Sequence, residues 1–112
     1  MVLSRGDIVG VNLYPIKGDE VGKTRPCVII SDNDSNAILN TIMVMPLSSH
    51  LIEDMLPYRM RLSKRGDLKK DSDILINHMR AISIKRVTSH ITKVTQEEYE
   101  LIISHLCKNF QS

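Results

Sequence analysis

Residues 18–30 read GDEVGKTRPCVII, a glycine-bounded polar loop that enters an apolar strand through an Arg-Pro pair. The run from Pro26 to Ser31 is almost continuously apolar and β-branched, which is typical of a strand covered on both faces. Proline fixes its own φ and keeps the residue before it extended. The sequence therefore predicts a stiff central strand with Arg25 held at its start, on the rim of the sheet.

Several other short apolar runs predict strands around this central one. They span Ile8 to Leu13, Thr41 to Leu47, Tyr58 to Ser63, Asp73 to Arg80, Ala81 to Ile84 and Ile91 to Val94. Most links between them are short, including SDNDSNA, which is interpreted as a turn-rich connection. This pattern favours a small antiparallel barrel over a parallel α/β sheet.

One of these strands alternates in a way that predicts a basic face. Tyr58, Met60 and Leu62 form its dry side, while Arg59 and Arg61 lie on the wet side. The connector that follows, KRGDLKKDS, is interpreted as a solvated loop, with a phosphate-steering loop as the alternative.

The end of the chain predicts an amphipathic helix. Thr95 and Glu98 make a T-x-x-E capping box. Apolar residues then recur at helical spacing, at Tyr99, Ile102, Ile103, Leu106 and Phe110. Leu101 falls off this stripe, so the helix either covers the barrel alone or also contributes to a subunit interface.

Composition limits the possible classes of protein. A chain of 112 residues with 42% hydrophobic and 25% charged residues predicts a single compact domain, residues 1–112. No apolar run is long enough for a membrane span or a secretory signal, which predicts a cytoplasmic protein. Cys27 and Cys107 are expected to be buried and reduced, and the four histidines lack metal-ligand spacing, so no metal and no cofactor are expected.

Three motifs together resemble the MazF/PemK family of toxin endoribonucleases. They are R-G-D-I at residues 5–8, the L-x-P-x-x-G-x-E-x-G-x-x-R-P frame from Leu13 to Pro26 with Tyr14 inserted, and the hydrophobic strand that follows. The segments PLSS, ILINHMR and IKRV and the C-terminal helix then come in the family's order. The resemblance covers nearly the whole chain.

This resemblance implies an SH3-like antiparallel β-barrel with a C-terminal α-helix, assembled as a homodimer. It implies sequence-selective cleavage of single-stranded RNA, often mRNA, and neutralisation by a cognate antitoxin protein. It further implies a reaction without metal, in which the ribose 2′-hydroxyl attacks and leaves a 2′,3′-cyclic phosphate and a 5′-hydroxyl.

Two positions match the family's catalytic residues. Arg25 matches the Arg of the R-P pair, and its planar, permanently charged fork suits stabilisation of a phosphorane. Ser48 matches a strand-end hydroxyl that is more often Thr, and Ser49 carries this role if the register shifts by one. The structural alternatives are a salt bridge from Arg25 to the loop acids and a turn hydroxyl for Ser48.

The remaining catalytic candidates leave the general base open. Glu20 matches the family's loop Glu and is interpreted as a residue that fixes the loop or positions Arg25, while Asp19 stands where some members carry His or Ser. Some members place an Arg and an Asp where this chain has Leu75 and Asn77, and neither of these transfers protons. His78, whose ordinary pKa is near 6.5, is the side hypothesis, with a groove-lining role as its alternative.

Polar residues around these positions, most of them basic, are predicted RNA contacts. They are Lys17, Lys23, Thr24, Arg59, Arg61 and Arg80, with Asn12 and Tyr14 as candidates for base recognition. Two rival functions use the same fold: a toxin that poisons DNA gyrase through its C-terminal helix, and a nucleic-acid-binding barrel without chemistry.

Overall fold

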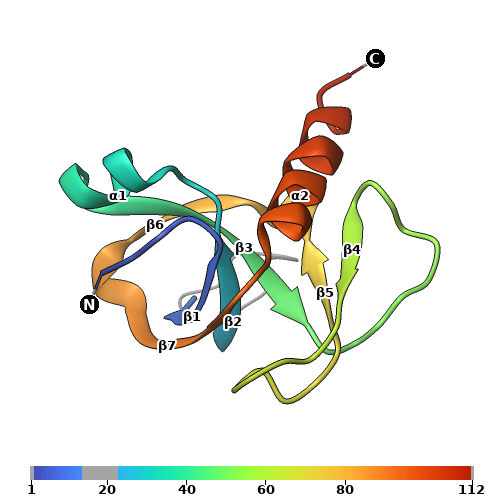
Figure 1. The fold of residues 1–112 in the computed structure, drawn as a ribbon, viewed down its shortest axis with the longest axis horizontal. Coiled ribbons are helices and arrows are strands. Elements are labelled where there is room, and N and C mark those ends of the chain that lie inside the picture. Colours follow the sequence, from blue (N-terminus) through green and yellow to red (C-terminus); the bar gives the residue numbers. More distant parts are fainter. Residues whose placement is uncertain (1, 14–22, 112) are drawn as a thin grey trace.

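The computed structural model describes residues 2–13 and 23–111 (Figure 1). The elements within these ranges are, in chain order, β1 (Asp7–Asn12), β2 (Thr24–Ile29), α1 (Asn33–Ile38), β3 (Thr41–Ser48), β4 (Arg59–Leu62), β5 (Ser72–Leu75), the 3-10 turn η1 (Ile76–His78), β6 (Arg80–Ser83), the 3-10 turn η2 (Ile84–Arg86), β7 (Val87–Lys93) and α2 (Gln96–Lys108).

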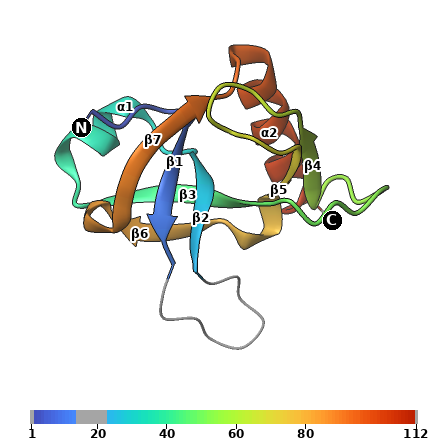
Figure 2. The same ribbon diagram turned by 90° about the horizontal axis from the view of Figure 1, so that it is seen from below.

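The strands form one antiparallel, seven-stranded sheet whose path runs β4-β5-β3-β2-β1-β7, while β6 pairs with the first half of β3 (Figure 2). Both views place α1 at one end of the sheet and α2 beside β4 and β5 at the other. The predicted small antiparallel β fold with a C-terminal helix is confirmed. The described strands do not close into a complete barrel, because no pairing joins β4 to β7.

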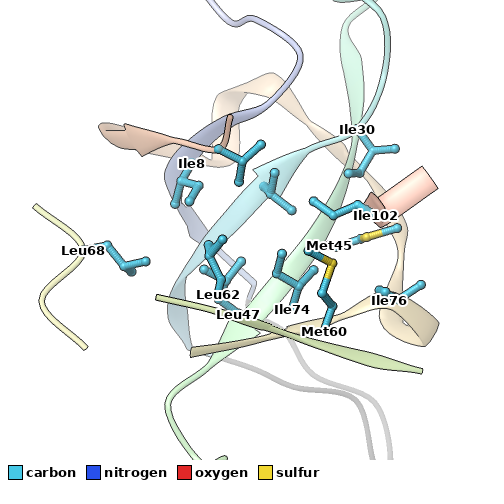
Figure 3. Packing of buried hydrophobic residues seen from close by; sticks show 12 residues of the cluster. Ile8, Ile30, Met45, Leu47, Met60, Leu62, Leu68, Ile74, Ile76 and Ile102 are labelled. Carbon is cyan, nitrogen blue, oxygen red and sulfur yellow. The ribbon is translucent and has the colours of Figure 1, made fainter. Parts of the chain in front are cut away.

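Two hydrophobic clusters cover the two faces of the central strands, as the continuous apolar run in β2 predicted. One cluster includes Val28, Met45, Leu47 and Ile74, and Ile102 from α2 packs into it (Figure 3). The other cluster is built from alternate positions of the same strands, Val9, Val11, Cys27, Ile29 and Val44, with Leu13, Ile42 and Ile82. The central strands are therefore rigidly supported on both sides.

The prediction of a turn-rich link for SDNDSNA was wrong, because this segment contains α1. The Asp32 carboxylate caps the helix by accepting a hydrogen bond from the Ser35 backbone N–H at 2.8 Å. Asn36 is buried, and its side chain donates to the Ser31 carbonyl at 2.9 Å. The residues that favour turns are the same ones that favour helix caps, and they served the second role here.

Side-chain burial corrects three further expectations. Cys27 is buried, but Cys107 is exposed on α2. Phe110 lies beyond the helix end at Lys108 and is 77% exposed, so it does not extend the buried stripe. Tyr58 precedes β4 and is 49% exposed, so the dry face of that strand consists of Met60 and Leu62.

Strand boundaries also differ from the sequence prediction near the C-terminal end. The strand expected from Asp73 to Arg80 ends at Leu75, where η1 turns the chain before β6 begins at Arg80. The last strand begins at Val87, four residues before the predicted Ile91. Most of its polar residues are exposed at the edge of the sheet, so they lack the apolar signal that marks the central strands.

The predicted capping box at the start of α2 is confirmed. Glu98 N–H donates to the Thr95 hydroxyl at 3.1 Å, and Thr95 N–H donates to Glu98 Oε1 at 2.8 Å. The Arg65 guanidinium donates to both oxygens of the same carboxylate. Among the described residues, no helix is long and apolar enough to cross a bilayer.

These contacts predict a pH-dependent contribution of Glu98 to stability. The hydrogen bond from Arg65 is the main cause that lowers the pKa of Glu98 below its ordinary 4.5. A lowered pKa stabilises the fold above the unfolded-state value, and this stabilisation is lost as the pH falls through the folded-state value. We expect Glu98→Gln to reduce the free energy of unfolding by about 1 kcal/mol at pH 7 and by much less at pH 3. Urea unfolding at both pH values measures this, with Glu97→Gln as the control in the same turn; equal losses at both pH values would contradict it.

Candidate active site

Arg25 lies at the start of β2, where the structure holds its side chain against the end of β3. Its backbone pairs with Val11 of β1, and its Nη1 donates to the Leu47 carbonyl at 3.4 Å. Cys27 pairs with Pro46, and continuing this antiparallel register by two residues sets Arg25 opposite Ser48. The two residues matched to the family's catalytic pair are thus neighbours across two strands.

The same row continues through the next two strands. Ser48 pairs with Asp73 of β5, and Asp73 pairs with Arg61 of β4. Residues directly opposite each other in an antiparallel pair share a face of the sheet. The side chains of Arg25, Ser48, Asp73 and Arg61 therefore belong to one face. Ser49 lies one residue beyond the end of β3, so the strand pairing does not assign it to a face.

A third guanidinium lies near this row, which already contains Arg25 and Arg61. Arg80 pairs with Val44 in the β3–β6 ladder and is half-buried. Burial raises the pKa of the Cys27 thiol to about 12, while the positive charges of Arg25 and Arg80 act to lower it. Both arginines therefore lie close enough to Cys27 to influence it. Because the thiol stays protonated, Cys27 is a packing residue and not a nucleophile.

Asp73 was not singled out from the sequence, yet its buried carboxylate has three partners at the site. It is 1% exposed, and its carboxylate accepts a hydrogen bond from Arg61 Nε at 2.7 Å and one from the Ile52 backbone N–H at 2.9 Å. Arg59 Nε lies 3.5 Å from Oδ2. Burial alone raises the pKa of Asp73, but these partners outweigh burial and hold the pKa below its ordinary value. The available signal was an Asp inside the apolar run SDILI, which the structure places beside a strand containing two arginines.

The segment after Ser48 is tied to the same network. The His50 backbone N–H donates to Ser48 Oγ at 3.1 Å, and Arg59 Nη2 donates to the His50 carbonyl at 3.0 Å. Arg61 Nη2 donates to the Glu53 carboxylate at 2.9 Å. Arg59 and Arg61, both predicted as RNA contacts, thus have acidic or carbonyl partners within the chain. Their role toward RNA stays a prediction.

A hollow of about 400 Å³ lies beside these strand ends and carries most of its charge as lysine. Lys23 and Thr24 line it next to Arg25, and Lys69 and Lys70 from the β4–β5 connector form part of its wall, together with Ser49. Lys23 has a φ of 70°, and its carbonyl accepts a hydrogen bond from Leu13 N–H at 2.9 Å. The structure therefore brings two predicted RNA contacts and the charged connector together on one side of the rim.

The other candidates are placed as follows. Lys17, Asp19, Glu20 and Tyr14 lie outside the described residues. Asn77 is exposed and His78 is half-buried, both in η1. The Asn12 carbonyl accepts a hydrogen bond from Arg86 at 3.1 Å. Across residues 2–13 and 23–111, no group of three or more His, Cys, Asp or Glu side chains is arranged to hold a metal ion.

Comparison with known proteins gives a consistent family match. Residues 4–110 match the family model described as PemK-like, MazF-like toxin of type II toxin-antitoxin system. The chain is 31% identical over 98 residues to Endoribonuclease EndoA of Bacillus subtilis (strain 168). The aligned region covers 87% of this chain and 84% of that protein.

Solved structures share the fold at lower sequence identity. A crystal structure of MazF from Deinococcus radiodurans has a TM-score of 0.82 and 19% identity, and the match covers 98% of this chain and 97% of that chain. An endoribonuclease in complex with its cognate antitoxin from Mycobacterial species has a TM-score of 0.75 and 14% identity, covering 97% of this chain and 93% of that one.

Proposed function

Since the chain belongs to the PemK-like, MazF-like toxin family of type II toxin–antitoxin systems, we propose that it is an endoribonuclease that cuts single-stranded RNA, such as mRNA, at selected sequences and so inhibits translation and growth. The single domain, residues 1–112, carries out this reaction without a metal. The observation that carries the proposal is the strand register that sets Arg25 opposite Ser48 at one rim.

The proposed reaction begins with attack of the ribose 2′-hydroxyl on the adjacent phosphorus. The bond to the 5′-oxygen breaks, which leaves a 2′,3′-cyclic phosphate and a 5′-hydroxyl. A proton leaves the 2′-oxygen and another reaches the departing 5′-oxygen, while negative charge increases on the phosphorane. Arg25 stabilises that charge through two N–H donors of its fork, and the Ser48 hydroxyl donates to a phosphate oxygen.

The proposal is tested by incubating the purified protein with a long RNA in EDTA. Discrete fragments with cyclic-phosphate and 5′-hydroxyl ends are expected. A protein that binds RNA but leaves it intact would instead be a non-catalytic barrel, and a gyrase-poisoning toxin would leave RNA intact while trapping gyrase on DNA. Either result would contradict the proposal.

We extend the proposal to two protein partners. The mycobacterial endoribonuclease was solved with its cognate antitoxin, and a disordered antitoxin segment that covers Arg25 and the lysine-lined hollow would block cleavage by occlusion. Adding a cognate antitoxin to the same assay should therefore stop fragment formation. A homodimer is also proposed, because Leu56 and Leu101 are 58% and 51% exposed and line a hollow next to α2 that contains both apolar and charged side chains. Light scattering measures its mass.

The lysine-lined hollow and the basic strand β4 make different contributions in this proposal. Lys23 lines the hollow, whereas Arg61 is bonded to Asp73 and Glu53. Lys23→Ala should lower the slope of log affinity against log salt by roughly 0.7, the value for one neutralised phosphate on a single strand. Arg61→Ala should lower the slope by less, because this guanidinium is already bonded to two carboxylates. An RNA with a single 2′-deoxy substitution at the cleavage site binds without being cut and is the probe. A slope that falls for Arg61→Ala and not for Lys23→Ala would reverse the assignment.

A further inference from the structure

Asp73 is a buried negative charge in β5, directly opposite Ser48 at the end of β3. Its neighbours in β5, Ile74 and Leu75, are buried and apolar. Replacing a buried ion pair with apolar residues of similar volume is often neutral or stabilising, so such a pair is weak support for a purely structural role. Asp73 pairs with Ser48 across β5 and β3, so a more specific role would be one that acts on Ser48.

The carboxylate holds the segment after Ser48 at two points. Directly, it accepts the hydrogen bond from Ile52 N–H at 2.9 Å. Indirectly, it lies beside Arg59, whose Nη2 donates to the His50 carbonyl at 3.0 Å. The backbone of His50 is thus fixed through its own carbonyl and through the residue two positions later.

Fixing His50 also orients the hydroxyl of Ser48. A serine hydroxyl has one hydrogen and two lone pairs. His50 N–H donates to Ser48 Oγ at 3.1 Å and so occupies one lone pair. This contact restricts the rotation of the hydroxyl, and its hydrogen stays available for an acceptor such as a phosphate oxygen.

We propose that Asp73 is a positioning residue for Ser48: through Ile52 and Arg59 it fixes the backbone at His50, and this backbone sets the orientation of the Ser48 hydroxyl. This inference rests on the proposed RNA cleavage. Asp73 itself touches no reacting atom. Its contribution depends entirely on Ser48, and this dependence separates it from a general structural role.

A double-mutant cycle tests this dependence. Asp73→Asn should lower kcat about tenfold with KM within about twofold, because the altered orientation weakens a contact made in the transition state. In a Ser48→Ala background the same substitution should cause no further loss of kcat. Asp71→Asn is the matched control: Asp71 also accepts a backbone hydrogen bond, from Lys64 N–H at 2.9 Å, but lies outside the network. It should cleave at the wild-type rate.

Two results would overturn the inference: Asp73→Asn with wild-type kcat, or an equal loss of kcat with and without Ser48. If Asp73→Asn does not fold at the assay temperature, Ile52→Pro replaces it under the same criteria. This substitution removes the N–H donor of a residue that is 41% exposed.

If wild-type protein does not cut RNA at all, the proposed function fails. The hydrogen bond from Ile52 N–H to Asp73 is then tested by hydrogen exchange of the backbone amides. Asp73→Asn should speed exchange of the Ile52 amide, and an unchanged rate would overturn this inference too.

Discussion

Replacing Arg25 with Ala is expected to reduce RNA cleavage by at least about 10²-fold while the protein stays folded. The guanidinium lies where β2 begins and β3 ends, with Nη1 donating to the Leu47 carbonyl at 3.4 Å. Pro26 keeps the Arg25 backbone extended, and flanking β1 and β3 fix the strand behind it. A charge held in this way needs little reorganisation when the phosphorane forms. The measurement is kcat/KM on a defined RNA, with circular dichroism as the check on folding.

Two further variants separate the shape of this cation from its charge. Arg25→Lys keeps the charge but loses the planar fork, so cleavage should recover only in part. Arg5→Ala removes a cation that lies over the Tyr99 ring, 4.9 Å from the centroid, and should leave cleavage at the wild-type level. Near-normal activity of Arg25→Ala would remove this residue from the mechanism. Equal losses in Arg5→Ala would show that general positive charge, and not Arg25 itself, is responsible.

The parts of the fold that sequence predicted well are those encoded by local patterns. The β-branched run after Pro26 predicted β2, and the T-x-x-E box with its apolar spacing predicted the start of α2. Where the local signal was ambiguous, the prediction failed. The SDNDSNA segment favours both turns and helix caps, and Phe110 continues the helical spacing although the helix has ended at Lys108. Local propensity alone does not show which alternative the rest of the chain stabilises.

The candidate site depends on information that local patterns do not contain. The family motif identified Arg25 and Ser48 individually, but only the pairing of β2 with β3 shows that they are neighbours. The Asp73 network joins β4, β5 and the segment after β3, with partners up to 21 residues apart in sequence. Such contacts arise from strand register, and a shift of one residue would turn every side chain to the opposite face.

Strand pairing also leads to the second large effect, which distinguishes Ser48, the last residue of β3, from Ser49 beyond its end. Ser48→Ala should slow cleavage about 10²-fold, because it removes a donor aimed at developing charge. Ser48→Thr should stay near the wild-type rate, since it keeps the hydroxyl and adds a methyl group that restricts χ1. Ser49 is exposed beyond the end of β3 and lines the lysine-lined hollow, so Ser49→Ala should change kcat little and act, if at all, through RNA binding. Single-turnover rates at saturating protein separate the two effects. If Ser49→Ala loses the rate and Ser48→Ala retains it, the catalytic hydroxyl is that of Ser49, and the pairing of Ser48 with Asp73 is structural.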